Sequence, residues 1–178
     1  MGEIKQARRV TPICGVIYRD GRVLENSWWE LEKLMGEVVL ESEEYPFDLT
    51  QYYFEQMGGP LKRRFIAFEG PSDPAELATW KLATNSLEER LTKAYAEEMG
   101  VARPINLDPG YITGAKLVLA TTKDFAHRLY LRDGIYAEVT LSYRDGRWLS
   151  HEYTFPDFRD GRYHAFFNKV REHHCRHN

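Results

Sequence analysis

Short apolar runs rich in β-branched and aromatic residues mark the strands that this chain is expected to form. Gly, Pro or Asp residues bound most of these runs, and this pattern is typical of strands joined by tight turns. Asp145-Gly146 and the triplet Asp108-Pro109-Gly110 each predict such a turn. The strands expected from the pattern are residues 12–18, 37–40, 61–69, 116–121, 128–131, 135–143 and 148–154.

Three other segments have apolar residues at the spacing of three or four that is typical of a helix. They are residues 24–35, 77–94 and 163–170, and the first two end near Gly36 and Gly100. Asp73 followed by Pro74 is a favourable start for the second helix, because Asp caps free N–H groups and Pro fits the first turn. Residues 84–86 are Thr-Asn-Ser, which compete for backbone hydrogen bonds, so they mark the place where this helix would break.

The resulting order is β-α-β-β-α-β, followed by hairpin strands and a terminal helix. We therefore expect an α+β fold with an antiparallel or mixed sheet, helices packed mainly on one face, and a ferredoxin-like βαββαβ core. The alternative, a doubly wound sheet, requires more regular alternation of strands and helices. The chain of 178 residues fits one domain, residues 1–178, in which residues 1–9 form a polar leader that we expect to be mobile.

Composition and charge narrow the classes of function. The formal net charge is −3, so a basic surface that grips nucleic acid as a whole is disfavoured, although a local basic groove remains open. The sequence contains no apolar run long enough for a membrane span and no apolar segment typical of a secretory signal. Two unpaired cysteines, Cys14 and Cys175, fit a reducing compartment. Together these features predict a cytoplasmic protein without a membrane segment.

Residues 106–128 place many polar side chains around one apolar strand. His127 is a candidate acid or base near neutral pH. A hairpin between residues 116–121 and 128–131 would bring Lys123 close to His127. The same composition also fits a charged hairpin tip on a solvated face. Cationic, amide and hydroxyl side chains together suit a phosphate or carboxylate, and those in this stretch are Asn106, Lys116, Thr122, Lys123 and Arg128.

Four carboxylates near the ends of predicted elements or within a strand are candidates for acid–base chemistry or for binding a divalent cation through oxygen. They are Asp48, Glu69, Asp108 and Glu138. Alternation along its strand puts Glu138 on the face of Tyr136 and Thr140, opposite Ala137, Val139 and Leu141. Four separate, solvated acids are the alternative interpretation.

Two further groups of residues invite a functional interpretation. Lys62-Arg63-Arg64 could contact phosphate groups, and Arg64 is therefore a ligand-binding candidate. Strand alternation places Arg63 on the opposite face from its two neighbours, which favours a charged strand entry that guards a sheet edge. The C-terminal tail, residues 173–177, carries three His and one Cys without the spacing of a structural zinc site, so we expect a frayed end and adventitious metal binding only.

Several motifs with known chemistry are missing from the sequence. No Gly is followed by Lys, so the chain lacks the phosphate-binding loop of P-loop proteins. It also lacks the Gly-x-Gly-x-x-Gly fingerprint, the Gly-x-Ser-x-Gly nucleophile elbow and the His-Glu-x-x-His zinc motif. These absences remove the best-known nucleotide and hydrolase classes from consideration.

The chain nevertheless resembles a known family over nearly its whole length. Residues 46–53, 106–111 and 116–123, together with His127-Arg128, resemble the bacterial family called domain of unknown function 4416. The resemblance implies a bacterial cytoplasmic protein and implies no established reaction. Some members are labelled as GTP-binding proteins, but this sequence has neither the phosphate loop nor an Asn-Lys-x-Asp guanine motif.

Our leading hypothesis is a protein that binds a phosphorylated or nucleotide-like small ligand, either as an enzyme or as a binding protein. The anion contacts would come from Arg64, Asn106, Lys116, Thr122, Lys123 and Arg128. The acid–base candidates, with a divalent cation as an open option, are Asp48, Asp108, His127 and Glu138. The alternative is a non-catalytic module that binds a protein partner or structured RNA, because Tyr and Trp are abundant in the chain and are favoured at interfaces. The oligomeric state is open.

Overall fold

In the computed structural model, which describes residues 2–177, strand β1 (Thr11–Tyr18) is buried along its whole length. It pairs antiparallel with β4 (Lys62–Phe68) on one side and with β5 (Ile105–Ile112) on the other. Strand β2 (Val38–Glu41) continues the sheet beyond β4, and the short β3 (Tyr45–Pro46) pairs with the start of β4. These strands form one half of the sheet.

The other half of the sheet begins at β6 (Lys116–Thr121), which pairs with β5 and with β8 (Ile135–Arg144). Strand β7 (Leu129–Arg132) forms the outer edge, and β9 (Arg147–Ser150) pairs with the far end of β8. Within residues 2–177 the result is one open antiparallel sheet of nine strands in the order β2-β4-β1-β5-β6-β8-β7, with β3 and β9 at its sides. The chain is thus an α+β protein, as the sequence predicts.

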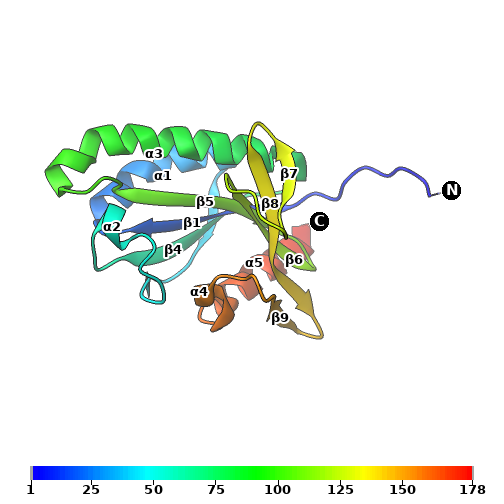
Figure 1. The fold of residues 1–178 in the computed structure, drawn as a ribbon. Coiled ribbons are helices and arrows are strands. Elements are labelled where there is room, and N and C mark those ends of the chain that lie inside the picture. Colours follow the sequence, from blue (N-terminus) through cyan, green and yellow to red (C-terminus); the bar gives the residue numbers. More distant parts are fainter. Residues whose placement is uncertain (1, 178) are drawn as a thin grey trace.

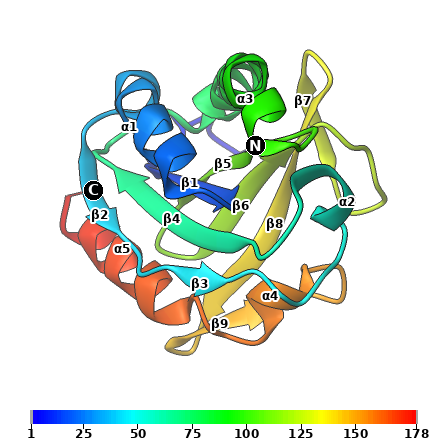
Figure 2. The same cartoon turned by 90° about the vertical axis from the view of Figure 1, so that its left-hand side faces the viewer.

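Helices cover both faces of the sheet. On one face lie α1 (Gly21–Met35) and α3 (Leu77–Met99), and on the other lie α4 (Pro156–Arg159) and α5 (His164–His177) (Figure 2). A first core cluster fills the α1 and α3 side, and a second core cluster, half of it aromatic residues, fills the α5 side. The short α2 (Phe54–Met57) follows β3. The sequence predicts helices mainly on one face; the two longest helices, α1 and α3, share a face, whereas α5 covers the other face because it carries its own apolar stripe.

Helix α3 starts where the sequence predicts and runs without a break. The Asp73 carboxylate accepts a hydrogen bond of 2.9 Å from the Ala75 N–H, in the 3₁₀ turn that precedes the helix. The predicted break at residues 84–86 is wrong, because the Thr84 hydroxyl donates to the Lys81 carbonyl one turn back and so stays within the helix. Gly100 ends the helix in the left-handed region. No helix in residues 2–177 has the length and apolar character needed to cross a membrane.

Strand β5 is the longest of the elements that the sequence pattern does not predict; the others are the short β3, α2 and α4. Asp108, Pro109 and Gly110 lie inside this strand and form no turn. Gly110 permits the strand pairing, because a Cβ atom there would come within 2.3 Å of the Val118 carbonyl oxygen on β6. The triplet therefore has a role in sheet packing that its composition, typical of a turn, conceals.

The pairing of the last strands also differs from the expected hairpin. Strand β8 lies between β6 and β7, so residues 116–121 and 128–131 are not neighbours in the sheet. A register shift opposite Leu117 and Val118 interrupts the alternation of β8. Leu141 therefore belongs to the second core cluster, whereas Val139 packs on the first.

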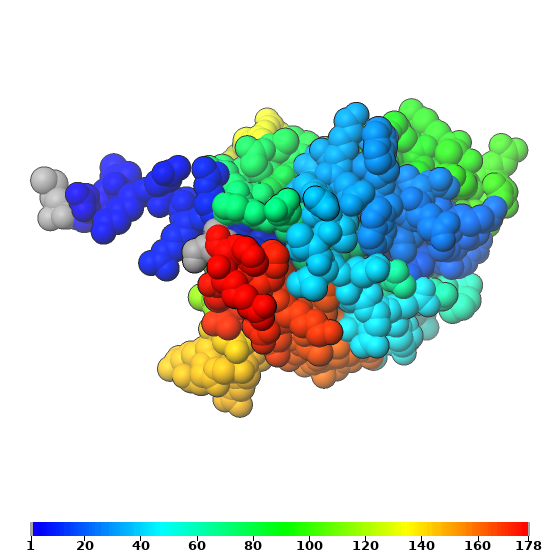
Figure 3. Space-filling view, turned by 180° about the vertical axis from the view of Figure 1, so that it is seen from behind, coloured from blue at the N-terminus to red at the C-terminus, as the bar shows by residue number. Residues whose placement is uncertain are grey.

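Residues 2–9 and the end of α5 lie on the same side of the molecule (Figures 1 and 3). Residues 2–9 have no regular structure and project away from the body (Figures 1 and 3). The first residue of β1, Thr11, lies within hydrogen-bond distance of the buried His174 of α5, with 3.1 Å between Oγ1 and Nδ1. Helix α5 continues through His177, so the predicted frayed tail is wrong.

Candidate functional site

The sheet splits open between its two central strands, β5 and β6. These strands pair only at Gly110–Ile112 of β5, opposite Leu117–Leu119 of β6. Before Gly110, β5 pairs only with β1, and beyond Leu119, β6 pairs only with β8. The long axes of β5 and β8 consequently cross in Figure 1. The diverging strands leave a cavity of about 300 Å³ between them.

The cavity has cationic, acidic and aromatic walls. Strands β4, β5, β6 and β8 and the segment 122–128 supply one part. Helix α3 and the segment after it supply a second, and the segments 47–53 and 155–158 supply a third. Its lining residues are Phe47, Thr50, Tyr52, Tyr53, Arg63, Lys81, Asn85, Arg103, Asn106, Asp108, Leu119, Ala120, Thr121, Thr122, Lys123, Arg128, Glu138, Phe155, Asp157 and Phe158.

Side chains take the place of the missing strand along the open edge of β5. The Leu107 N–H donates to the Glu88 carboxylate at 2.6 Å, and the Lys81 ammonium donates to the Leu107 carbonyl at 2.7 Å. The Arg103 guanidinium donates to the Ile105 carbonyl at 3.2 Å and pairs with Glu88 at 2.5 Å. Pro109, two residues beyond Leu107, has no N–H to satisfy. The gap therefore stays open without leaving these backbone groups unpaired.

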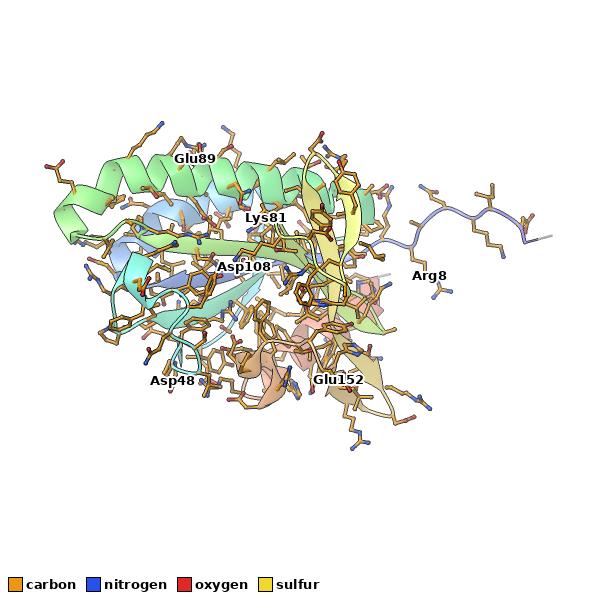
Figure 4. All side chains as sticks on the ribbon, viewed as in Figure 1. Arg8, Asp48, Lys81, Glu89, Asp108 and Glu152 are labelled. Atoms are coloured by element: carbon orange, nitrogen blue, oxygen red, sulfur yellow. The ribbon has the colours of Figure 1, made fainter. Side chains whose placement is uncertain are left out.

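Asp108 is the carboxylate that β5 contributes to the cavity lining. Its Oδ2 atom accepts hydrogen bonds from Asn106 Nδ2 at 2.7 Å and from Arg63 Nη2 at 3.3 Å. Its Oδ1 atom lies 3.6 Å from the Lys81 ammonium. Figure 4 shows Lys81 and Asp108 side by side in the middle of the molecule. Two cations and one amide donor thus surround this carboxylate.

Arg63 connects the cavity floor to helix α4. Its side chain is only 5% exposed, and its guanidinium pairs with Asp157 of α4 and with Asp108. Aromatic rings surround the same guanidinium, with the centroids of Phe47 and Phe158 at 4.9 and 5.1 Å. Planar guanidinium groups stack on rings and bridge carboxylates in this way. Arg63 thus fixes the 155–158 wall against the sheet.

Glu138 forms the carboxylate on the opposite wall. It is buried and accepts a hydrogen bond of 2.9 Å from Arg128 Nε. His127 Nε2 lies 3.3 Å from the same carboxylate, and the imidazole stacks on the Tyr153 ring at 3.9 Å. His127 does not line the cavity, so it contacts and positions Glu138 from outside the cavity.

Lys123 stands at the mouth of the cavity. Its ammonium contacts the Tyr52 hydroxyl and lies 4.3 Å from the centroid of that ring. The Lys123 N–H donates to the Thr121 hydroxyl at 3.2 Å, and Arg128 donates to the Lys123 carbonyl at 3.0 Å. In the part of the chain that the structure describes, no carboxylate pairs with Lys123. This cation is available to an anionic ligand.

Burial shifts the proton affinity of two groups at the site. It raises the pKa of Tyr53, and the charge of Asp108 adds to the effect, so the phenol remains a hydrogen-bond donor at neutral pH. Burial also raises the pKa of Glu88, although Lys81 and Arg103 act in the opposite direction.

The structure brings together six of the ten residues that the sequence predicts as site residues. His127 touches Glu138 from outside, as described, and three predicted residues lie elsewhere. Asp48 is exposed and pairs with Arg162 at 2.9 Å. Arg64 points to the opposite face from Arg63 and pairs with Glu41, and Lys116 is exposed at the other end of β6. The six that line the cavity are Asn106, Asp108, Thr122, Lys123, Arg128 and Glu138.

The carboxylates considered for a cation site do not converge. Asp48 and Glu69 are absent from the cavity lining, whereas Asp108 and Glu138 face cationic partners on separate strands. Among residues 2–177, no three His, Cys, Asp or Glu side chains meet in a group that could hold a metal ion.

The sequence interpretation misses Arg63 and Lys81 as site residues. Lys81 and Glu88 lie at helical spacing with Leu77, Thr84 and Leu91, all of them buried on α3. A cation and an acid within an apolar stripe are the signal that could have identified them. For Arg63 the signal is the strand alternation, which places its side chain on the opposite face of the sheet from Lys62 and Arg64. The edge-guarding interpretation is wrong, because β4 is an inner strand between β1 and β2.

Comparison with known proteins identifies the family. A family model described as "Domain of unknown function (DUF4416)" matches residues 8–174. No curated protein and no solved structure matches the chain. The match extends over nearly the whole chain and includes all the residues that line the cavity. The chain therefore belongs to the DUF4416 family.

Proposed function

We propose that this protein binds a small phosphorylated or nucleotide-like ligand in the cavity between β5 and β6. The observation that carries the proposal is Lys123, a cation at the cavity mouth that has no carboxylate partner among residues 2–177 and lies beside Arg128 and the Thr122 hydroxyl. Cations and hydroxyl groups in this arrangement suit a phosphate or carboxylate group.

The balance of charge in the lining supports the same proposal. Five cationic side chains face three carboxylates in the lining, and Glu88 pairs with one of the cations, Arg103, from outside it, which leaves an excess of one cation that favours an anion. The cations are Arg63, Lys81, Arg103, Lys123 and Arg128, and the carboxylates are Asp108, Glu138 and Asp157.

Aromatic side chains give the cavity a surface for a planar or sugar-like group. Phe47, Tyr52, Tyr53 and Phe155 come from two segments that face the open side of the sheet. The volume of about 300 Å³ lies at the lower end of the range for small-ligand sites. Asp108 and Glu138 are the acid–base candidates that line the cavity, should the bound ligand be converted.

Thermal unfolding of the full chain tests this proposal. A panel of nucleotides and sugar phosphates, with and without magnesium, should contain a compound that raises Tm. At a ligand concentration of about 100 times Kd, the stabilisation is about 2.7 kcal/mol, which corresponds to about 5–10 °C for a chain of this size.

Lys123→Ala should remove most of this shift, and Lys116→Ala should retain it. Lys116 is the matched control because it is an exposed lysine on the adjoining strand that does not line the cavity. The proposal is wrong if no compound shifts Tm, or if both variants lose the shift equally.

A second candidate function is a non-catalytic interaction module, which the exposed edge strand β7 favours. The Leu129, Tyr130 and Leu131 side chains are 72%, 62% and 40% exposed on this edge. Edge strands with apolar side chains are suited to pairing with another chain. Retention of one defined protein or RNA from a bacterial lysate, abolished by Leu129→Lys and accompanied by no ligand response, would favour this candidate.

We also infer a ferredoxin-like unit in the first part of the chain. Strands β1, β2, β4 and β5 are adjacent in the order β2-β4-β1-β5, and α1 and α3 lie on one face. The connection order β-α-β-β-α-β supports this inference. The fourth strand of the unit would be β5, whereas the sequence pattern assigns residues 116–121 to that place.

A further inference from the structure

Asp108 lines the cavity and pairs with Gly15 of β1, and the opening between β5 and β6 leaves it without a partner on β6. Asp108 and Asn106 alternate with Ile105 and Leu107, which point into the first core cluster. The side chain of Asp108 is 22% exposed, although it lies among largely buried residues. Part of this carboxylate is therefore accessible from within the cavity.

The hydrogen bonds of Asp108 fall unevenly on its two oxygens. Both direct donors, Asn106 and Arg63, bond to Oδ2. The Lys81 ammonium is 3.6 Å from Oδ1, too far for a direct hydrogen bond, and it already donates to the Leu107 carbonyl at 2.7 Å. An ionised carboxylate has about four acceptor positions. Oδ1 consequently has unused capacity to accept hydrogen bonds from a ligand.

The two ends of the cavity suit different chemical groups. A phosphate would be repelled by Asp108 and attracted to Lys123 and Arg128 at the mouth. The group that reaches Asp108 has to be a hydrogen-bond donor, because an ionised carboxylate only accepts. The ligand that fits is thus anionic at one end and carries O–H or N–H groups toward the other, with the aromatic rings of Tyr52 and Tyr53 alongside.

We propose that the ligand is a ribose phosphate in the broad sense, either a ribonucleotide or a free sugar phosphate, and that Asp108 Oδ1 accepts a hydrogen bond from a ribose hydroxyl. This inference rests on the proposed function and names its substrate class. Carboxylates bind ribose hydroxyls in the same way in dinucleotide-binding folds. The hydrogen bond gives the site a means to select ribose over deoxyribose.

Calorimetric titration of the unaltered full chain tests the proposal from the ligand side. Each ribonucleoside monophosphate is compared with its 2′-deoxy and 3′-deoxy forms, and ribose 5-phosphate with 2-deoxyribose 5-phosphate. Removing the recognised hydroxyl should weaken binding about ten- to hundredfold, as for other hydrogen bonds to a charged group. If only the nucleotides show the preference for the ribo form over the deoxy form, the ligand is a nucleotide. If ribose 5-phosphate shows the same preference over 2-deoxyribose 5-phosphate, the ligand is a free sugar phosphate.

The outcomes separate this inference from the proposed function. If nucleotides bind and both deoxy forms bind as tightly as the ribonucleotide, the hydroxyl contact is wrong while the anion site stands. That result would also follow if Asp108 bound an amino group of the base. If none of these compounds binds but another compound of the thermal panel raises Tm, the ribose assignment is wrong and the anion site stands; if no compound of either panel binds, both proposals fall.

Asp108→Asn provides the protein-side test. The substitution keeps the shape of the side chain and removes its charge. The affinity for the ribose compound should therefore fall toward the affinity for its deoxy forms. Asp48→Asn is the matched control, since Asp48 is an exposed aspartate at the periphery (Figure 4) and should leave the preference unchanged. Circular dichroism establishes whether Asp108→Asn folds, and the ligand-side comparison decides the question if it does not.

Discussion

The ammonium group of Lys81 donates a hydrogen bond of 2.7 Å to the carbonyl oxygen of Leu107, at the edge of β5 where a neighbouring strand would normally bind. Glu88 lies seven residues after Lys81 on the same face of the helix, and its carboxylate accepts a hydrogen bond from the Leu107 N–H. Helix α3 thus supplies one donor and one acceptor to the unpaired edge. The cavity exists because side chains, and not β6, satisfy this part of the backbone.

Glu88→Ala should lower the free energy of unfolding by about 3 kcal/mol. The change leaves the buried Leu107 N–H unsatisfied and removes the carboxylate partner of Arg103. Urea denaturation measures the effect. Glu89→Ala is the control, because Glu89 is exposed and points away from the sheet (Figure 4), so its loss should cost less than about 0.5 kcal/mol. Equal effects of the two substitutions would contradict this role of Glu88.

Gly110→Ala should destabilise the point at which the two halves of the sheet meet. The added Cβ would lie within 2.3 Å of the Val118 carbonyl oxygen, so β5 and β6 would have to move apart. Overpacking of this kind costs about 1–3 kcal/mol. Because the cavity opens directly beyond Gly110, ligand affinity should fall as well.

Gly21→Ala is the control for the glycine at the junction. Gly21 begins α1, and a Cβ there meets nothing within 4 Å, so the substitution should be neutral or stabilise by up to about 1 kcal/mol. A Gly110→Ala variant with an unchanged urea midpoint would show that the strands can separate at this point without cost.

Arg63→Lys should lower stability by about 3 kcal/mol, although the charge is retained. An ammonium group cannot bridge two carboxylates as a guanidinium does, so Asp157 or Asp108 would lose its partner in a buried setting. Arg64→Lys is a control one residue away, where a single partly exposed pair with Glu41 is at stake and the effect should stay below about 0.5 kcal/mol. Thermal or urea unfolding of the two variants distinguishes them directly, and similar losses would contradict the bridging role.

Much of the secondary structure could be predicted from the sequence, because apolar residues recur every second position in a strand and every three or four positions in a helix with one buried face. The 3₁₀ turn that Asp73-Pro74 begin just before α3, and the end of α3 at Gly100, follow directly from capping chemistry. Strand β5 could not be predicted in this way. Its Asp-Pro-Gly triplet has the composition of a turn, and only the gap beside it makes the missing N–H of Pro109 acceptable.

The candidate site could be predicted only in part for a related reason. Lys123 and Arg128 stand out because they flank an apolar strand, and the structure places them at the cavity. Arg63, Lys81 and Asp157 come from three elements that are remote in sequence, and their meeting depends on how the sheet twists and splits. The spacing of residues along the sequence indicates that Lys81 is buried within an apolar stripe, but it does not predict that Lys81 lies close to Asp108.

Stability should fall as the pH is lowered through the range in which histidines of α5 take up protons. Burial lowers the pKa of His174 below its ordinary value of 6.5, and the nearby charges of Arg171 and His173 add to this shift. Between the unfolded and folded pKa values the unfolded chain binds more protons, so acid favours unfolding. The contribution of His174 is therefore fully present above about pH 6.5 and is lost as the pH falls through its folded pKa.

Urea midpoints at about pH 7.5 and 5.5 measure this effect in the unaltered chain and in His174→Gln. The unaltered chain should lose more stability between the two pH values than the variant, because Gln can still hydrogen-bond Thr11 but does not titrate. His164 and His173 shift in the same direction and are present in both proteins, so their share cancels in the comparison. His177→Gln, at an exposed position on the same helix, should keep most of the pH dependence, because it removes only the part of the His173 shift that the His177 charge causes. If His174→Gln also keeps it, the coupling of pH to stability lies outside the contact between α5 and β1.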